Sequence, residues 1–90
     1  KCSPDVAKDM LSSAITVLGA VHTWNDWNIK EVLSGLAEGL DVKTATLMWP
    51  VRIAAAGKAV TPGGAVEICR ILGKEETIRR LKLGLEKLNG

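Results

Sequence analysis

The sequence predicts an all-α fold, a compact bundle of about five helices in a single domain that spans residues 1–90. Apolar residues recur at spacings of three and four, as on one face of a helix, and no segment keeps the alternation of a strand. Prolines and glycines stand where helices typically begin and end. Ninety residues suffice for one core but not for two. Because Phe and Tyr are absent, that core must be mainly aliphatic.

The first helix is predicted from Pro4 to about Val21. Ser3 offers a capping hydroxyl, and proline at the first helical position loses no needed hydrogen bond. A second helix is expected to begin after Asn28, with Glu31 closing a capping box. Its apolar stripe consists of Ile29, Val32, Leu33, Leu36, Ala37 and Leu40.

The third helix is predicted from about Thr46 or Met48 to Ala56, and Gly57 ends it. Pro50 must lie in its first turn or kink it. Thr61 is then expected to cap a fourth helix that runs from Pro62 to Leu72 and ends at Gly73. Glu75 opens a fifth, basic helix whose apolar residues are Ile78, Leu81, Leu85 and Leu88.

Charge is unevenly distributed along the chain. Residues 1–45 hold four lysines against six acids, whereas residues 46–90 hold eight basic residues against four acids. A polyanionic partner would therefore favour the second half, although solvated surface lysines would give the same count.

Two isolated cysteines, Cys2 and Cys69, are expected to be free thiols in a reducing, cytoplasmic compartment. No stretch reaches the roughly 18 apolar residues needed to cross a bilayer, and Lys1-Cys2-Ser3 does not open a signal peptide. A chain that starts without Met is expected to be a fragment of a longer protein.

The inventory of reactive side chains argues against catalysis. His22 is the only histidine, and neither metal-ligand spacing nor a nucleophile beside a base is present. Gly57-Lys58 and Pro62-Gly63-Gly64 are too short for a phosphate-binding Walker loop. We therefore expect no catalytic residue, no metal and no cofactor in this chain.

A binding site is the better prediction, and two features indicate it. Arg52 is the only charge on an otherwise apolar helix, so it either pairs with Glu67 or Glu38 or reaches a ligand at the domain edge. The helix start at residues 61–64 would expose N–H groups suited to phosphates or base edges. The candidate binding residues are Arg52, Thr61, Pro62, Gly63 and Gly64.

Further cations in the second half could track an RNA backbone, or could be the solvated side of core helices. These candidates are Lys58, Arg70, Lys74, Arg79 and Arg80.

The run from Met48 to Leu81 closely resembles the last segment of the anticodon-binding region of bacterial-type glutamyl-tRNA synthetases. An alanine-rich helix with Pro50-x-Arg52 leads through Gly57 to Thr61-Pro62-Gly63, and then to Leu72-Gly73-Lys74-Glu75 and an arginine-rich helix. The resemblance implies the second of two helical anticodon-binding subdomains, at the C-terminal end of a class I synthetase. Arg52, Thr61 and Pro62 would then contact anticodon bases, with Gly64 packed near them.

The same resemblance implies tRNA(Glu) as the partner of a monomeric domain, with tRNA(Gln) as a second candidate. Many members of the family carry bulky apolar residues where this chain has Gly64-Ala65. ATP and Mg²⁺ would belong to the catalytic domain of the parent ligase, which these 90 residues lack.

Two other functions were weighed. A helix-turn-helix DNA-binding module would place the fifth helix in the major groove, but Glu75, Glu76 and Thr77 occupy its first turn. A protein-interaction domain would expose Trp49 and Val60 as anchors.

Overall fold

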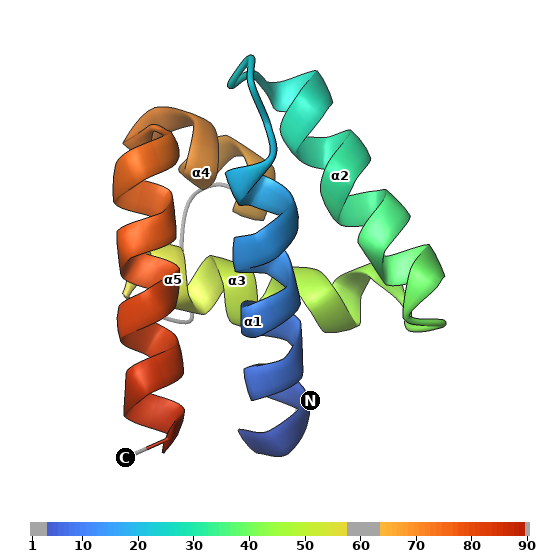
Figure 1. Ribbon diagram of the computed structural model, residues 1–90, viewed down its shortest axis with the longest axis vertical. Helices are drawn as coiled ribbons and strands as arrows, with labels where there is room; N and C mark the ends of the chain where they lie inside the picture. The colour runs from blue at the N-terminus through green and yellow to red at the C-terminus, as the bar shows by residue number, and fades with distance from the viewer. Residues whose placement is uncertain (1–3, 58–63, 90) are drawn as a thin grey trace.

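Five helices follow one another in the computed structural model, which describes residues 4–57 and 64–89. They are α1 (Pro4–Gly19), α2 (Asp26–Gly39), α3 (Thr44–Ala56), α4 (Ala65–Leu72) and α5 (Lys74–Asn89). No strand occurs in these two ranges, so the all-α prediction is confirmed. Antiparallel α1 and α5 lie side by side, α2 lies on the other side of α1, and α3 crosses all three (Figure 1).

The central helix is α3, which packs against each of the other four helices. Its sequence is apolar almost all round, and Leu47, Pro50, Val51 and Ala55 are buried. The buried side chains of α1, α2 and α5, among them Leu18, Ile29, Leu33 and Leu81, complete one aliphatic core. Burying such side chains contributes about 1.5–3 kcal/mol each to folding.

A glycine sets the distance between α3 and α5. A Cβ atom on Gly84 would lie only 2.9 Å from the Cβ of Ala54, so this position needs a residue without a side chain. The two helices can therefore approach closely, although glycine inside a helix costs up to about 1 kcal/mol relative to alanine.

Three predicted helix starts are wrong, and the first two are those of α2 and α3. The N-cap of α2 is Asn25, whose side chain accepts a hydrogen bond from the backbone N–H of Asn28 at 2.8 Å. Asn28 lies inside the helix and donates its side-chain amide to the carbonyl of Thr23. The third helix begins at Thr44, so Pro50 is its seventh residue and not part of the first turn.

The fourth helix also begins later than predicted, because α4 starts at Ala65 and its N-cap is Gly64. The predicted cap Thr61 and the predicted first residue Pro62 lie outside the described residues. Gly57 ends α3 in the left-handed conformation (φ 79°), and Gly73 ends α4, as predicted. The first helix ends at Gly19, shortly before the predicted Val21.

The carbonyl oxygen of Cys69 joins three parts of the chain. It accepts hydrogen bonds from Trp24 Nε1 at 2.9 Å, from the hydroxyl of Thr77 at 3.1 Å and from the backbone N–H of Gly73 at 3.1 Å. Nearby, Lys74 Nζ donates to the carbonyl of Val21 at 2.6 Å. These bonds fix the α4–α5 corner against the connection between α1 and α2.

Cys69 itself is a buried free thiol, as predicted, whereas Cys2 lies outside the described residues. Burial raises the pKa of the Cys69 thiol to about 11, so the group stays protonated at neutral pH.

Replacing Thr77 by valine should lower the free energy of unfolding by about 1 kcal/mol, because the shape is kept while one buried hydrogen bond is lost. Thr77 is fully buried, whereas the hydroxyl of the exposed Thr16 bonds the carbonyl of Ser12 on its own helix. Thr16→Val is therefore the matched control and should change stability much less in urea denaturation. Equal effects of the two substitutions would contradict a special role for the Cys69 carbonyl.

Candidate functional site

Two hollows open on either side of α3. The first, named here the Arg52 hollow, has a volume of about 380 Å³ and lies between α2, α3 and the start of α4. Its lining residues are Lys30, Ser34, Thr44, Ala45, Met48, Trp49, Arg52, Gly64, Ala65 and Val66.

Within the Arg52 hollow, the guanidinium of Arg52 lies over the indole of Trp49, with 5.0 Å between its central carbon and the ring centroid. Such a cation–π contact is worth about 0.5–2 kcal/mol. The sequence predicts either an ion pair of Arg52 with Glu67 or Glu38 or a ligand at the domain edge, and the contact with Trp49 is neither of these. The contact places the guanidinium beside the Trp49 ring, on the wall of the hollow.

Gly64 lines the same hollow as Arg52 and is exposed. Among the described residues, apart from its chain neighbours, none has a heavy atom within 4 Å of the position where its Cβ would stand. The first N–H groups of a helix have no partner within the helix and favour electron-rich ligands. The structure thus brings together two of the predicted binding residues, Arg52 and Gly64.

Four predicted residues lie outside the described part of the chain: Lys58, Thr61, Pro62 and Gly63. Two others are described but line neither hollow. Arg70 forms an ion pair with Asp26 at 2.6 Å, and the amine of Lys74 donates to the carbonyl of Val21. Their described contacts join α4 and α5 to the α1–α2 side of the bundle.

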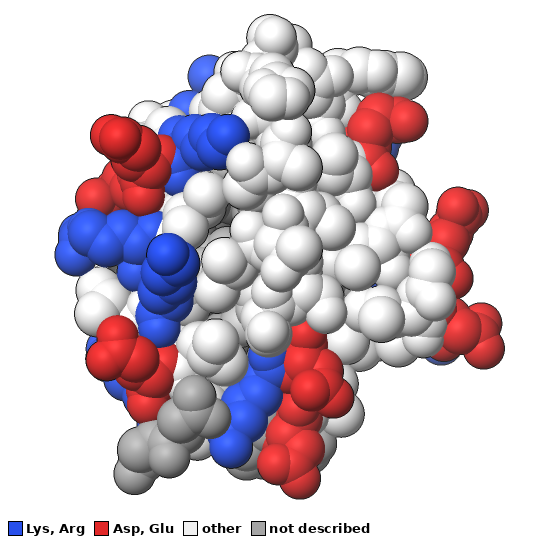
Figure 2. Space-filling model, in the orientation of Figure 1, with Lys and Arg blue, Asp and Glu red and all other residues white. Residues whose placement is uncertain are grey.

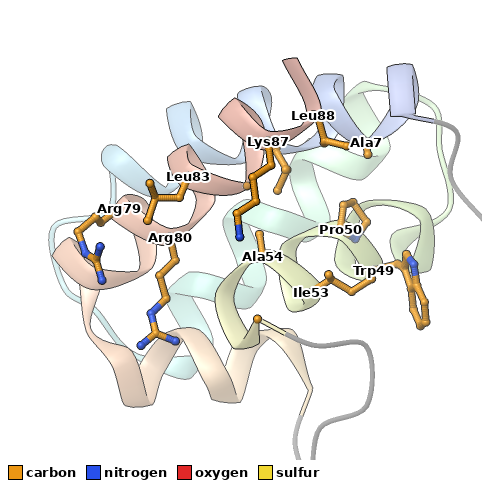
Figure 3. Close-up of a pocket in the computed structure, with 13 residues that line it drawn as sticks. Ala7, Trp49, Pro50, Ile53, Ala54, Arg79, Arg80, Leu83, Lys87 and Leu88 are labelled. Carbon is orange, nitrogen blue, oxygen red and sulfur yellow. The ribbon is translucent and has the colours of Figure 1, made fainter. Parts of the chain in front are cut away.

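The second hollow, named here the Lys87 hollow, has a volume of about 570 Å³ and lies between α1, α3 and α5. Its basic residues come from α5, and its apolar residues come from all three helices (Figure 3). The lining residues are Ala7, Leu11, Trp49, Pro50, Ile53, Ala54, Gly57, Arg79, Arg80, Leu83, Gly84, Lys87 and Leu88.

Glu76 holds both arginines of this hollow. Its carboxylate accepts hydrogen bonds from Arg79 at 2.9 and 2.6 Å and from Arg80 at 2.7 Å. The hydrogen bonds from Arg79, and to a smaller extent the one from Arg80, lower the pKa of Glu76 to about 2. The bond to Glu76 in turn raises the pKa of Arg79. Arg80 also donates to the carbonyl of Ala55 at 2.8 Å, which ties α5 to the end of α3.

No acidic residue is among the described residues that line the two hollows, whereas five basic ones are: Lys30, Arg52, Arg79, Arg80 and Lys87. On the face seen in Figure 2, basic side chains gather on the α5 side among a few acids, and the α2 side shows mostly acids. The two hollows therefore offer cations and apolar surface together, which suits a nucleic acid better than a cationic or neutral ligand.

Sequence reasoning missed three residues of the hollows. Lys30 and Lys87 carry no local signal, because only the packing of α2 and α5 against α3 brings them to the hollows. Trp49 stands one residue before Pro50 and was considered only as an anchor for a protein partner. It lines both hollows, and its position beside Pro50-x-Arg52 is a signal that could have identified it.

Neither a membrane span nor a metal centre is found in residues 4–57 and 64–89. No helix there is long and apolar enough to cross a bilayer. No group of three or more His, Cys, Asp and Glu side chains is placed to hold a metal ion. His22 is exposed.

Comparison with known proteins identifies the family. The family model described as "Anticodon binding domain" matches residues 1–85, and the chain belongs to this family. The matched family is a binding domain, which confirms the prediction that these 90 residues are not themselves the enzyme.

Curated relatives are glutamate–tRNA ligases of clostridia. That of Clostridium acetobutylicum is 42% identical over 88 residues, which are 98% of this chain and 18% of the ligase. The ligase of Clostridium tetani is 46% identical over 80 residues, which are 89% of this chain and 16% of that ligase. The ligase of Clostridium botulinum is 49% identical over 78 residues, which are 87% of this chain and 16% of that ligase. The predicted resemblance is confirmed, and the chain spans less than a fifth of the length of these relatives.

The titration of Glu76 tests the geometry of the arginine pair. Because its folded pKa of about 2 lies below the ordinary 4.5, the stability that this group contributes is present above pH 4.5 and is lost as the pH falls towards 2. An NMR titration of the side-chain carboxyl should give a midpoint near 2, and Arg79→Ala should move it upwards more than Lys82→Ala does. An ordinary midpoint in the unmodified chain would show that the two arginines do not hold Glu76.

Proposed function

We propose that this chain binds the anticodon loop of tRNA as the C-terminal domain of a glutamate–tRNA ligase, and that tRNA(Glu) is its RNA. The family match and the ligase relatives support the class of ligand. The observation that carries the proposal is the Arg52 hollow, where an arginine stacked on Trp49 and the start of α4 line one space, and none of the described lining residues is acidic.

Arg52 would read a base edge. A guanidinium presents its donors in a rigid fork that matches paired acceptors on a base, and each such pair discriminates by about 1–3 kcal/mol. The contact with the Trp49 ring would restrict the guanidinium before the base binds, so less conformational freedom would be lost on binding. The helix start at Gly64 and Ala65 would supply backbone donors opposite it.

The open space at Gly64 bears on the choice of RNA. A glycine followed by the small Ala65 provides no apolar wedge against a base, so the hollow imposes a weak limit on its shape. We therefore include tRNA(Gln) as a second RNA. In this proposal the domain is monomeric and works in the cytoplasm, and ATP and Mg²⁺ act in the catalytic domain of the parent ligase.

The geometry of α5 does not support the alternative function of a helix-turn-helix DNA-binding module. The first turn of α5 carries Glu75 and Glu76, and Glu76 is engaged with Arg79 and Arg80. That arrangement places acidic groups where a recognition helix would meet DNA.

Arg52→Ala should weaken binding to a glutamate anticodon stem-loop by about 1–3 kcal/mol and binding to an unrelated stem-loop much less. Arg52→Lys keeps the positive charge but removes the planar guanidinium. The variant should therefore bind the two RNAs with similar affinity, while its affinity keeps most of its dependence on salt concentration. The measurement is a pair of fluorescence titrations for each variant, with melting temperatures recorded beside them. Equal losses on both RNAs would reduce Arg52 to a phosphate contact.

A further inference from the structure

We infer that the Lys87 hollow is a second nucleotide subsite, which takes the base and phosphate of the nucleotide flanking the anticodon triplet. The inference rests on the proposed function and extends it to a surface on the other side of Trp49. It also assigns roles to Lys87 and Leu83.

The two hollows adjoin each other at Trp49, whose side chain lines both of them. The Arg52 hollow includes Gly64, and the Lys87 hollow includes Gly57 at the end of α3. An RNA strand with one base beside Arg52 would therefore pass Trp49 and bring its next nucleotide to the Lys87 hollow. Successive bases on aromatic and apolar side chains are a common way of holding a single strand.

The lining of the Lys87 hollow matches the two halves of a nucleotide. Its floor is the close contact of α3 with α5 at Ala54 and Gly84, and Ile53 and Leu83 add apolar surface. Leu83 is 42% exposed, so its side chain can contact a ligand without unpacking the core. Unstacked bases are held between apolar or aromatic side chains in this manner.

Lys87 supplies the charge for the phosphate. Glu76 already accepts hydrogen bonds from Arg79 and Arg80, but Lys87 forms no ion pair with any residue of 4–57 or 64–89. In Figure 3 its amine points down from α5 into the space above Ala54. An amine on a long side chain can follow a phosphate without fixing its orientation.

The size of the hollow also fits. Its volume of about 570 Å³ lies within the roughly 300–1,000 Å³ that is usual for sites of small organic groups. An acidic peptide could also bind the cations and the apolar wall of the Lys87 hollow. The continuity with the Arg52 hollow through Trp49 favours RNA, since a single strand occupies both.

The test uses two matched pairs of variants of the whole 90-residue chain. Lys87→Ala is compared with Lys82→Ala, which removes an exposed lysine of the same helix that lines neither hollow. Leu83→Ala is compared with Ile71→Ala, which removes an exposed apolar side chain outside both hollows. Affinity for the glutamate anticodon stem-loop is measured at several salt concentrations.

Lys87→Ala should weaken binding about three- to tenfold and lower the salt slope by about one unit, whereas Lys82→Ala should do neither. Leu83→Ala should weaken binding about threefold without changing the salt slope, and Ile71→Ala should leave it unchanged.

Abasic stem-loops then locate the base. An RNA without the base on either the 5′ or the 3′ side of the triplet should bind roughly fivefold more weakly, and Leu83→Ala should cause no further loss on that RNA. Additive losses on both abasic RNAs would overturn the inference, as would equal behaviour of each variant and its control.

The outcome also separates this inference from the proposed function. If Arg52→Ala impairs binding while the Lys87 and Leu83 variants match their controls, only the second subsite is wrong. If the unmodified chain binds no stem-loop, both are wrong.

Discussion

The structure depends on α3 being enclosed by the other four helices. Its sequence holds one charged residue among thirteen, so the helix is stable only if nearly its whole surface is covered. Four helices packed around one cylinder leave gaps between them, and both hollows lie in such gaps. Trp49 and Arg52 are the large polar or amphipathic residues that α3 places there. The same apolar character that buries the helix therefore fixes where Trp49 and Arg52 reach the two hollows.

A second constraint positions the walls of these gaps. The carbonyl of Cys69 accepts bonds from Trp24 and Thr77, and the amine of Lys74 bonds the carbonyl of Val21. These contacts hold the α4–α5 corner against the α1–α2 connection, and the direction of α5 follows from them. Since α5 also carries Arg79, Arg80 and Lys87, hydrogen bonds at its first turn help to position the cations of the Lys87 hollow.

Sequence patterns predicted the helices, their approximate order and the glycines that end α3 and α4, because spacing and left-handed positions are local properties. They failed at helix starts where the chain gives no side-chain signal. Lys43 and Gly64 cap α3 and α4 without a side-chain hydrogen bond, whereas Pro50 and Thr61 carry strong local signals for a helix start. In α2, two asparagines competed for the role of cap, and only the structure shows that Asn25 has it.

The candidate site was predictable to the extent that it lies on α3 and the start of α4. Arg52 was noticed because it is the only charge on its helix, and the family resemblance paired it with Gly64. Lys30 and Lys87 could not be found, since each reaches its hollow only through tertiary packing. For the same reason, Arg70 and Lys74 looked like free cations in the sequence, but each contacts a distant segment.

The central claim is that RNA binds along α3 across Trp49, and the three tryptophans of the chain test it directly. Trp24 is tied to the Cys69 carbonyl inside the bundle, and Trp27 is exposed on α2 outside both hollows. The measurement follows the three indole N–H signals by NMR as a glutamate anticodon stem-loop is added. We expect a large, saturating shift of the Trp49 signal, with the signals of Trp24 and Trp27 almost unmoved. A shift of Trp27 with Trp49 unchanged would place the RNA on another face and contradict the account.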